Sequence, residues 1–246
     1  MASTFVIGDI HGDRAALEAL LHKLPAEADD TVVFLGDYVD RGPDSRGVVE
    51  RVRQFVREFP GKTVTLRGNH EDAWMEMHEK PDQGFLFPER NGCLQMMQSY
   101  VDTTGMDQAQ LYALLIEPKK WLPREHVDWF RSLAVWYEDE HGIYVHAGLD
   151  GKNGVWKHPT QGREVAMLWT RNSDFWVQYE GKTVCFGHTT VDCLPNDHLN
   201  WLQQIFDKKD DVWKRGALLG LDTGSGKGGF LSAVELPRRK VFESRE

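Results

Sequence analysis

The chain has 246 residues, of which 41% are hydrophobic and 27% charged, a composition typical of a globular protein rather than of a disordered or fibrous one. Its formal net charge of −9 argues against a nucleic-acid polymer as a partner, because such a surface needs clustered Lys and Arg. No apolar run approaches the ~20 residues of a membrane helix, and the three cysteines include no Cys-x-x-Cys pair, so we expect a cytoplasmic protein without a membrane partner.

The first third of the chain alternates short strands with amphipathic helices. Apolar runs of strand length lie at 5–7, 32–35 and 64–66. Between them, apolar residues recur with helical spacing over 17–24 and 48–56, and Asp13 is placed to cap the first helix. This alternation predicts βαβ units and a mostly parallel sheet.

The rest of the chain is expected to complete a single domain over residues 1–246. Residues 72–142 are predicted to be a mainly helical insertion that shapes the substrate rim, and the charge-mixed residues 238–246 are predicted to be an exposed tail. Further apolar runs predict strands at 143–145, 184–186, 217–221 and 230–236. The glycines of 224–229 match a dinucleotide-binding loop by letters, but a strand is predicted after them instead of a helix, so we expect only a turn.

Residues able to bind a metal lie just after five of the predicted strands. They are Asp9 and His11, then Asp37, then Asn69, and later His146 and His188. Taken alone, each has an ordinary interpretation as a turn residue, a helix cap or a buried histidine. Their repetition favours one shared site, because ligand sites lie at the carboxyl ends of parallel strands. Carboxylate, amide and imidazole donors without a thiolate suit Mn²⁺, Fe or Zn²⁺.

Five short motifs surround these residues. They are Gly8-Asp9-Ile10-His11-Gly12, Gly36-Asp37-Tyr38-Val39-Asp40-Arg41-Gly42, Arg67-Gly68-Asn69-His70-Glu71, Val145-His146-Ala147-Gly148 and Phe186-Gly187-His188-Thr189. In this order, and over residues 5–189, the sequence resembles the calcineurin-like metallophosphoesterase superfamily, and within it the phosphoprotein phosphatases of the small bacterial and phage type. Leu221-Asp222-Thr223-Gly224 is similar to the closing motif of that branch.

The resemblance implies an α/β fold of the metallo-dependent phosphatase type, in which two packed mixed β-sheets are flanked by helices as four layers, α/β/β/α. It also implies two divalent metal ions, with Mn²⁺ expected and Fe or Zn²⁺ as alternatives. Carried over by position, Asp9 and His11 bind one ion, Asp37 bridges both, and Asn69, His146 and His188 bind the other. A bridging carboxylate suits ions that must lie ~3.5–4 Å apart to clamp the attacking and leaving oxygens.

The same resemblance assigns a general acid, His70, whose ring is held by Asp40. A neighbouring carboxylate orients an imidazole and favours its protonated form, although a purely structural contact is the alternative for His70. Arg41 and Arg67 lie inside the matched motifs and Arg171 lies in a looser match. All three are predicted to bind phosphate, since a guanidinium donates two parallel hydrogen bonds to it. For Arg171, an ordinary surface arginine is the alternative.

The favoured hypothesis is a hydrolase of the protein serine/threonine phosphatase type, in which a metal-bridging hydroxide attacks a phosphate monoester in line. The alternative is a symmetrical bis(5'-nucleosyl)-tetraphosphate hydrolase, which shares the metal motifs and cleaves a phosphoanhydride. A non-catalytic binding protein that keeps the fold is a third hypothesis, and the complete ligand set argues against it. The expected partner is thus a phosphorylated protein or a small phosphoester.

Overall fold

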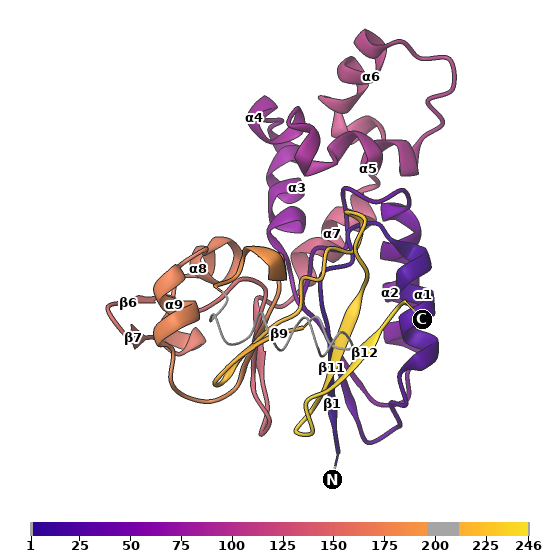
Figure 1. The fold of residues 1–246 in the computed structure, drawn as a ribbon. Coiled ribbons are helices and arrows are strands. Elements are labelled where there is room, and N and C mark those ends of the chain that lie inside the picture. The colour runs from indigo at the N-terminus through magenta and orange to yellow at the C-terminus, as the bar shows by residue number, and fades with distance from the viewer. Residues whose placement is uncertain (1, 196–211, 246) are drawn as a thin grey trace.

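The computed structural model describes residues 2–195 and 212–245 (Figure 1). Its strands are β1 (Thr4–Ile7), β2 (Thr31–Phe34), β3 (Lys62–Thr65), β4 (Trp136–Glu138), β5 (Ile143–Val145), β6 (Gly151–Lys152), β7 (Val155–Trp156), β8 (Val184–Phe186), β9 (Trp213–Arg215), β10 (Leu218–Gly220), β11 (Ser232–Leu236) and β12 (Lys240–Glu243). Its α-helices are α1 (Arg14–Lys23), α2 (Ser45–Glu58), α3 (Asn69–Glu79), α4 (Gln83–Leu86), α5 (Cys93–Tyr100), α6 (Gln108–Leu115), α7 (Arg124–Ser132), α8 (Glu164–Trp169) and α9 (Ser173–Gln178). Short 3₁₀ turns are η1 (Glu89–Asn91), η2 (Pro118–Lys120), η3 (Pro159–Gln161) and η4 (Val191–Cys193).

Two five-stranded mixed sheets form the centre of the molecule. The first has the order β12-β11-β1-β2-β3, in which β1, β2 and β3 are parallel and β11 is antiparallel to β1. The second has the order β4-β5-β8-β10-β9, in which β5, β8 and β10 are parallel. The predicted parallel units are therefore present, with antiparallel strands added at the sheet edges.

Three apolar clusters separate the layers, because successive strand residues point to opposite faces of a sheet. From β1, Val6 joins Val33 and Leu219 in the cluster that contains residues of both sheets. Its neighbour Phe5 points the other way, into the cluster that includes residues of α1 and α2. A third cluster joins the second sheet to α8 and α9. The predicted four-layer arrangement is confirmed, with α1 and α2 on one outer face and α8 and α9 on the other (Figure 1).

Both helices beside the first sheet begin at an aspartate cap. Asp13 Oδ1 accepts a hydrogen bond from Ala16 N at 2.9 Å, as the sequence predicts for α1. Asp44 Oδ1 accepts one from Gly47 N at 2.8 Å at the start of α2. These bonds satisfy amides that have no partner inside the helix, and each cap typically stabilises a helix by about 1 kcal/mol.

The segment 72–142 contains most of α3 and all of α4 to α7, followed by β4. Helices α3 to α6 project beyond the two sheets (Figure 1). Trp74 of α3 is buried against Trp121, which follows η2, and their rings lie 5.1 Å apart, edge to face. In the described ranges, no helix has both the length and the apolar character needed to span a membrane.

The prediction of an exposed tail at 238–246 is wrong for its central part. Residues 240–243 form β12, which pairs antiparallel with β11. The Phe242 ring packs 6.0 Å from that of Phe5, and Lys23 Nζ donates a hydrogen bond to Glu243 O at 3.1 Å. This strand was not predicted because charged residues surround it in the sequence. It contains a β-branched and an aromatic residue, and such a run pairs readily with an open sheet edge. Residues 224–229 form a turn before β11, as expected.

Candidate active site

The loops after five strands bring the six predicted metal ligands together. Asp9 and His11 follow β1, Asp37 follows β2, Asn69 begins α3 after β3, and His146 and His188 follow β5 and β8. None of the six is more than 5% exposed. The carboxyl ends of parallel strands in both sheets therefore meet at one buried point.

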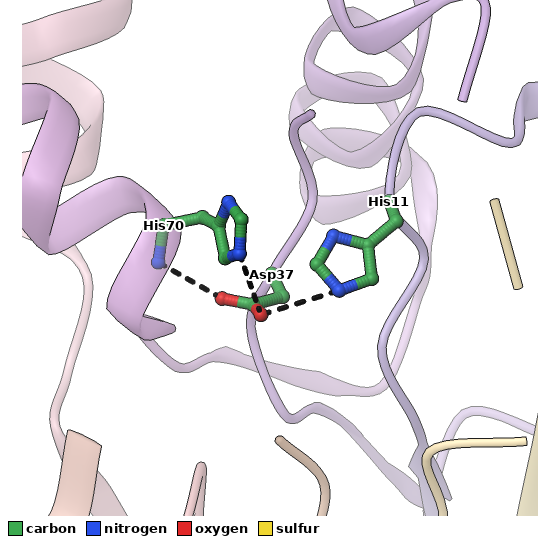
Figure 2. A group of neighbouring side chains, drawn as sticks. All are labelled: His11, Asp37 and His70. Carbon is green, nitrogen blue, oxygen red and sulfur yellow. Dashed lines mark hydrogen bonds and ion pairs between the residues drawn. The ribbon is translucent and has the colours of Figure 1, made fainter. Parts of the chain in front are cut away.

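Asp37 lies at the centre of this group. Its Oδ2 lies 3.3 Å from His11 Nε2, and its Oδ1 lies 3.4 Å from His146 Nε2. His70 approaches the same carboxylate, with Nε2 3.9 Å from Oδ2 and the backbone N donating to Oδ1 at 3.0 Å. Figure 2 shows Asp37 between His11 and His70. Its two oxygens thus face two separate groups of nitrogen donors, as a bridging ligand requires.

Asn69 connects the two later histidines. Its Oδ1 lies 2.7 Å from His188 Nδ1 and 2.9 Å from His146 Nε2. Asp9 lies on the other side, where its Oδ2 accepts a hydrogen bond from His188 N at 2.9 Å and lies 3.8 Å from His11 Nε2. The six side chains therefore form one continuous cluster.

Burial disfavours the charged, imidazolium form of the three histidines of the cluster. Burial lowers the pKa of His11 and His146, and it lowers that of His188 to about 2. The Nδ1–H groups of His11 and His146 donate to backbone carbonyls, those of Val39 and Leu35, each at 3.0 Å. A neutral imidazole that donates through Nδ1 keeps its Nε2 lone pair free, which is the form that binds a metal.

Several polar atoms of the cluster lack the partner that a cation would provide. The Nε2 lone pair of His146 faces the Asn69 carbonyl oxygen, which brings two acceptors together. Within the described part of the chain, Asp9 Oδ1 and His188 Nε2 are buried without any hydrogen-bond partner. Burying such atoms costs free energy unless something pairs with them. These residues therefore fit bound cations.

The two aspartates of the cluster differ in charge environment. Burial, followed by the nearby Asp222 and Asp37 carboxylates, raises the pKa of Asp9 well above its usual value. Burial also opposes ionisation of Asp37, but attraction to the charged forms of the surrounding histidines, His146 first, brings its pKa well below the usual value. A divalent cation would favour the ionised form of both carboxyl groups.

Asp40, His70 and Trp74 form a buried triad beside this cluster. His70 Nδ1 lies 2.5 Å from Asp40 Oδ2, and Trp74 Nε1 donates to Asp40 Oδ1 and Oδ2 at 3.0 and 2.9 Å. Burial raises the pKa of Asp40, although both partners oppose that effect. Because Nδ1 is held by Asp40, the ring presents Nε2 toward Asp37 and the centre of the site.

The three candidate arginines lie in different surroundings. Arg41 Nη1 contacts His11 Nε2, so a cation that binds His11 must replace this contact. Arg171 Nη1 donates to Thr189 Oγ1 at 3.0 Å, directly beside His188 in the chain. Arg67 forms ion pairs with the carboxylates of Asp72 and Glu164 instead of with residues of the cluster. The structure thus brings Arg41 and Arg171 next to the candidate ligands and ties Arg67 to acidic neighbours.

Two residues that support the site have no role in the sequence-based prediction. The buried Glu71 accepts four backbone N–H groups, of which Asp37, Tyr38 and Val39 belong to the loop of the central carboxylate. Trp74, the second, orients Asp40. Its position four residues after His70 on α3 could have predicted that Trp74 lies beside His70, because residues four apart share a helix face.

The fold and this cluster together define a metal-dependent phosphoesterase. Residues 2–192 match the family model of the calcineurin-like phosphoesterases, so the chain belongs to this family, whose members hydrolyse phosphoesters with a dinuclear metal centre. The resemblance stated from the sequence motifs is confirmed at the level of the superfamily.

Similar proteins include members with different substrates. The symmetrical bis(5'-nucleosyl)-tetraphosphatase of Nitrosospira multiformis is 26% identical, and the match covers 98% of this chain and 94% of that protein. A serine/threonine-protein phosphatase of Caenorhabditis elegans is 32% identical over 102 residues, which cover 37% of this chain and 22% of that protein.

Solved structures share the fold. A candidate diadenosine tetraphosphatase superposes with a TM-score of 0.66 at 20% identity, covering 98% of this chain and 92% of the other. A protein serine/threonine phosphatase of Saccharomyces cerevisiae superposes with a TM-score of 0.54 at 15% identity, covering 100% and 81%. At these identities the likeness concerns the fold alone.

Proposed function

We propose that this phosphoesterase is a phosphomonoesterase that acts on phosphoserine and phosphothreonine in proteins. The observation that carries the proposal is the buried Asp40–His70 pair, with Nδ1 and Oδ2 2.5 Å apart. Hydrolysis of a serine phosphate expels an alkoxide, a strong base that needs a proton as it leaves. A phosphoanhydride expels a phosphate oxygen whose pKa is only about 6, so it depends far less on an acid.

The candidate ligands would hold two divalent cations. Asp9 and His11 would bind one, Asn69, His146 and His188 the other, and Asp37 would bridge them. When bound, such ions lower the pKa of water and neutralise charge on the phosphoryl group. The buried setting of these ligands keeps their orientation fixed and strengthens their charge interactions.

The remaining residues act on the substrate itself. Asp40 accepts a hydrogen bond from the Nδ1–H group of His70 and so fixes the ring, and the proton on Nε2 passes to the leaving oxygen. Trp74 keeps the Asp40 carboxylate in place through its Nε1. Arg41 contacts His11 and Arg171 donates to Thr189 beside His188, and both would bind the non-bridging phosphate oxygens. Arg67 would join them only after leaving its acidic partners.

Hydrolysis of symmetrical dinucleoside tetraphosphates is the second candidate function. It is favoured by one observation, the match to the Nitrosospira multiformis tetraphosphatase over nearly the full length of both proteins. The same metal ligands would serve this reaction, and the helices α3 to α7 would then have to accommodate two nucleosides.

The leaving group distinguishes the two functions. We expect the Mn²⁺-loaded protein to hydrolyse a phosphoserine peptide faster than diadenosine tetraphosphate. His70→Asn should lower kcat on the peptide about 10²-fold to 10⁴-fold, and much less on an aryl phosphate whose phenolate leaves without a proton. Preferred turnover of diadenosine tetraphosphate, or an equal loss on peptide and aryl phosphate, would contradict the proposal. The exposed His22, as His22→Asn, is the matched control.

A further inference from the structure

The segment 85–93 runs from the end of α4 through η1 into α5 and closes on itself. Asn91 Nδ2 donates to Phe85 O at 2.8 Å, and Gly92 N donates to Glu89 O at 3.0 Å. We call residues 85–93 the clasp. It belongs to the helical insertion, yet it contacts two residues of the candidate active site.

The first of these contacts is with Arg41. The backbone N of Arg41 donates to Gly92 O at 3.3 Å, and its side-chain Nε donates to Arg90 O at 3.3 Å. Arg41 itself has a left-handed backbone with φ 68°, a conformation that a non-glycine residue keeps only when its surroundings hold it there. The clasp therefore fixes both the backbone and the first part of the side chain.

Gly92 is the point of closest approach. Its φ is +74°, and a Cβ atom at this position would overlap the backbone N and Cα of Arg41. These are backbone atoms, so they cannot rotate away as the end of a long side chain could. Only glycine allows the clasp to lie this close to Arg41.

The second contact is with the Asp40–His70–Trp74 triad. The Phe85 ring lies 5.8 Å from the His70 ring and 6.2 Å from the Trp74 ring, edge to face in both cases. Since Asn91 holds the Phe85 carbonyl, one small loop supports the arginine and the imidazole together.

We infer that the clasp is a positioning element for phosphate binding, which places the Arg41 guanidinium through Gly92. This inference rests on the proposed function, in which Arg41 binds the phosphate of the substrate. Nε is held by Arg90 O, whereas Nη1 contacts His11 Nε2. A cation that binds His11 would release Nη1, so both terminal nitrogens could then bind an anion. The insertion thus affects phosphate affinity directly, in addition to shaping the rim.

A glycine pair in the same insertion gives a matched test. Gly105 has φ +80°, close to the value of Gly92, but a Cβ there would meet nothing within 4 Å. Gly92→Ala and Gly105→Ala therefore share the backbone strain and differ in the contact with Arg41. We expect Gly92→Ala to weaken inorganic phosphate binding to the Mn²⁺-loaded protein about tenfold, measured by calorimetric titration. Gly105→Ala should leave it unchanged.

Double variants show whether the effect passes through Arg41. If it does, Gly92→Ala added to Arg41→Ala should cause no further loss of phosphate affinity, because the positioned group is already gone. The inference would be overturned if the double variant lost phosphate affinity by the product of the two single-variant factors. It would also be overturned if Gly105→Ala had the same effect as Gly92→Ala. If Gly92→Ala fails to fold in thermal unfolding, Asn91→Ala replaces it and must show the same non-additivity. Binding of phosphate is read without turnover, so absent phosphoserine hydrolysis would count against the proposed function alone.

Discussion

The side chains of the site differ in how far along the chain their partners lie. Asp9, His11 and Asp37 follow their strands by only a few residues, so strand prediction alone brings them to one edge. Glu71 and Trp74 stand within or near the same motifs, but their partners are backbone amides and a carboxylate more than thirty residues away. Such long-range hydrogen bonds depend on packing, and no local pattern encodes them.

Glu71 gives the clearest prediction for a single residue. Burial and then the charge of Asp37 raise its pKa to about 8, whereas each of its oxygens accepts two backbone N–H groups. In Glu71→Gln the amide NH₂ would face two of these donors. We expect the free energy of unfolding to fall by about 2 kcal/mol and Mn²⁺ affinity to fall at least about tenfold.

Urea unfolding and Mn²⁺ titration measure these two effects. The exposed Glu76 lies on the same helix, and Glu76→Gln should change neither quantity. Wild-type stability and wild-type Mn²⁺ affinity in Glu71→Gln would show that the Asp37 loop does not need this carboxylate.

Secondary-structure elements were predicted well where a clear period was present, as in α1, α2 and the parallel strands. β12 was missed because its run is short and lies among charges, although it follows β11 directly in the chain and pairs with it as an antiparallel hairpin. The position of the clasp was also beyond prediction, since it depends on how the insertion packs against the loop after β2.

At the scale of elements, Asp150 links the loop after β5 to the start of α8. Its carboxylate accepts hydrogen bonds from Arg163 Nη2 at 2.8 Å and from Arg163 N at 3.2 Å. Hydrogen bonding to Arg163 holds the pKa of Asp150 well below its usual value. Because folding lowers this pKa, the stabilisation is complete above the ordinary value of about 3.9 and is lost only as the pH falls through the folded-state value.

Asp150→Asn should therefore lower the free energy of unfolding by about 1 kcal/mol at pH 7, a modest value because the Arg163 side chain is 73% exposed. The difference from wild type should persist at pH 5 and decline below pH 4, as followed by urea unfolding. The exposed Asp29, as Asp29→Asn, is the control. A difference that disappears between pH 7 and pH 5 would contradict the assignment to Asp150.

For the molecule as a whole, the fold and the phosphoesterase family follow from motifs spread over residues 5–189. The choice of substrate does not, because proteins with different substrates resemble this chain. We propose that the groups that distinguish these substrates lie in the insertion and around α8, where the sequence has no repeated pattern. The two sheets pack through a middle apolar cluster and place the candidate ligands, and helices α3 to α6 project beyond them (Figure 1).

If Asp37 bridges two cations held by side chains from five strand ends, anomalous diffraction from crystals grown with Mn²⁺ should show two peaks, one beside each oxygen of Asp37. At least one of these peaks should be lost in Asp37→Asn. A single peak, or two peaks with Asn69 and His188 turned away from both, would contradict this arrangement.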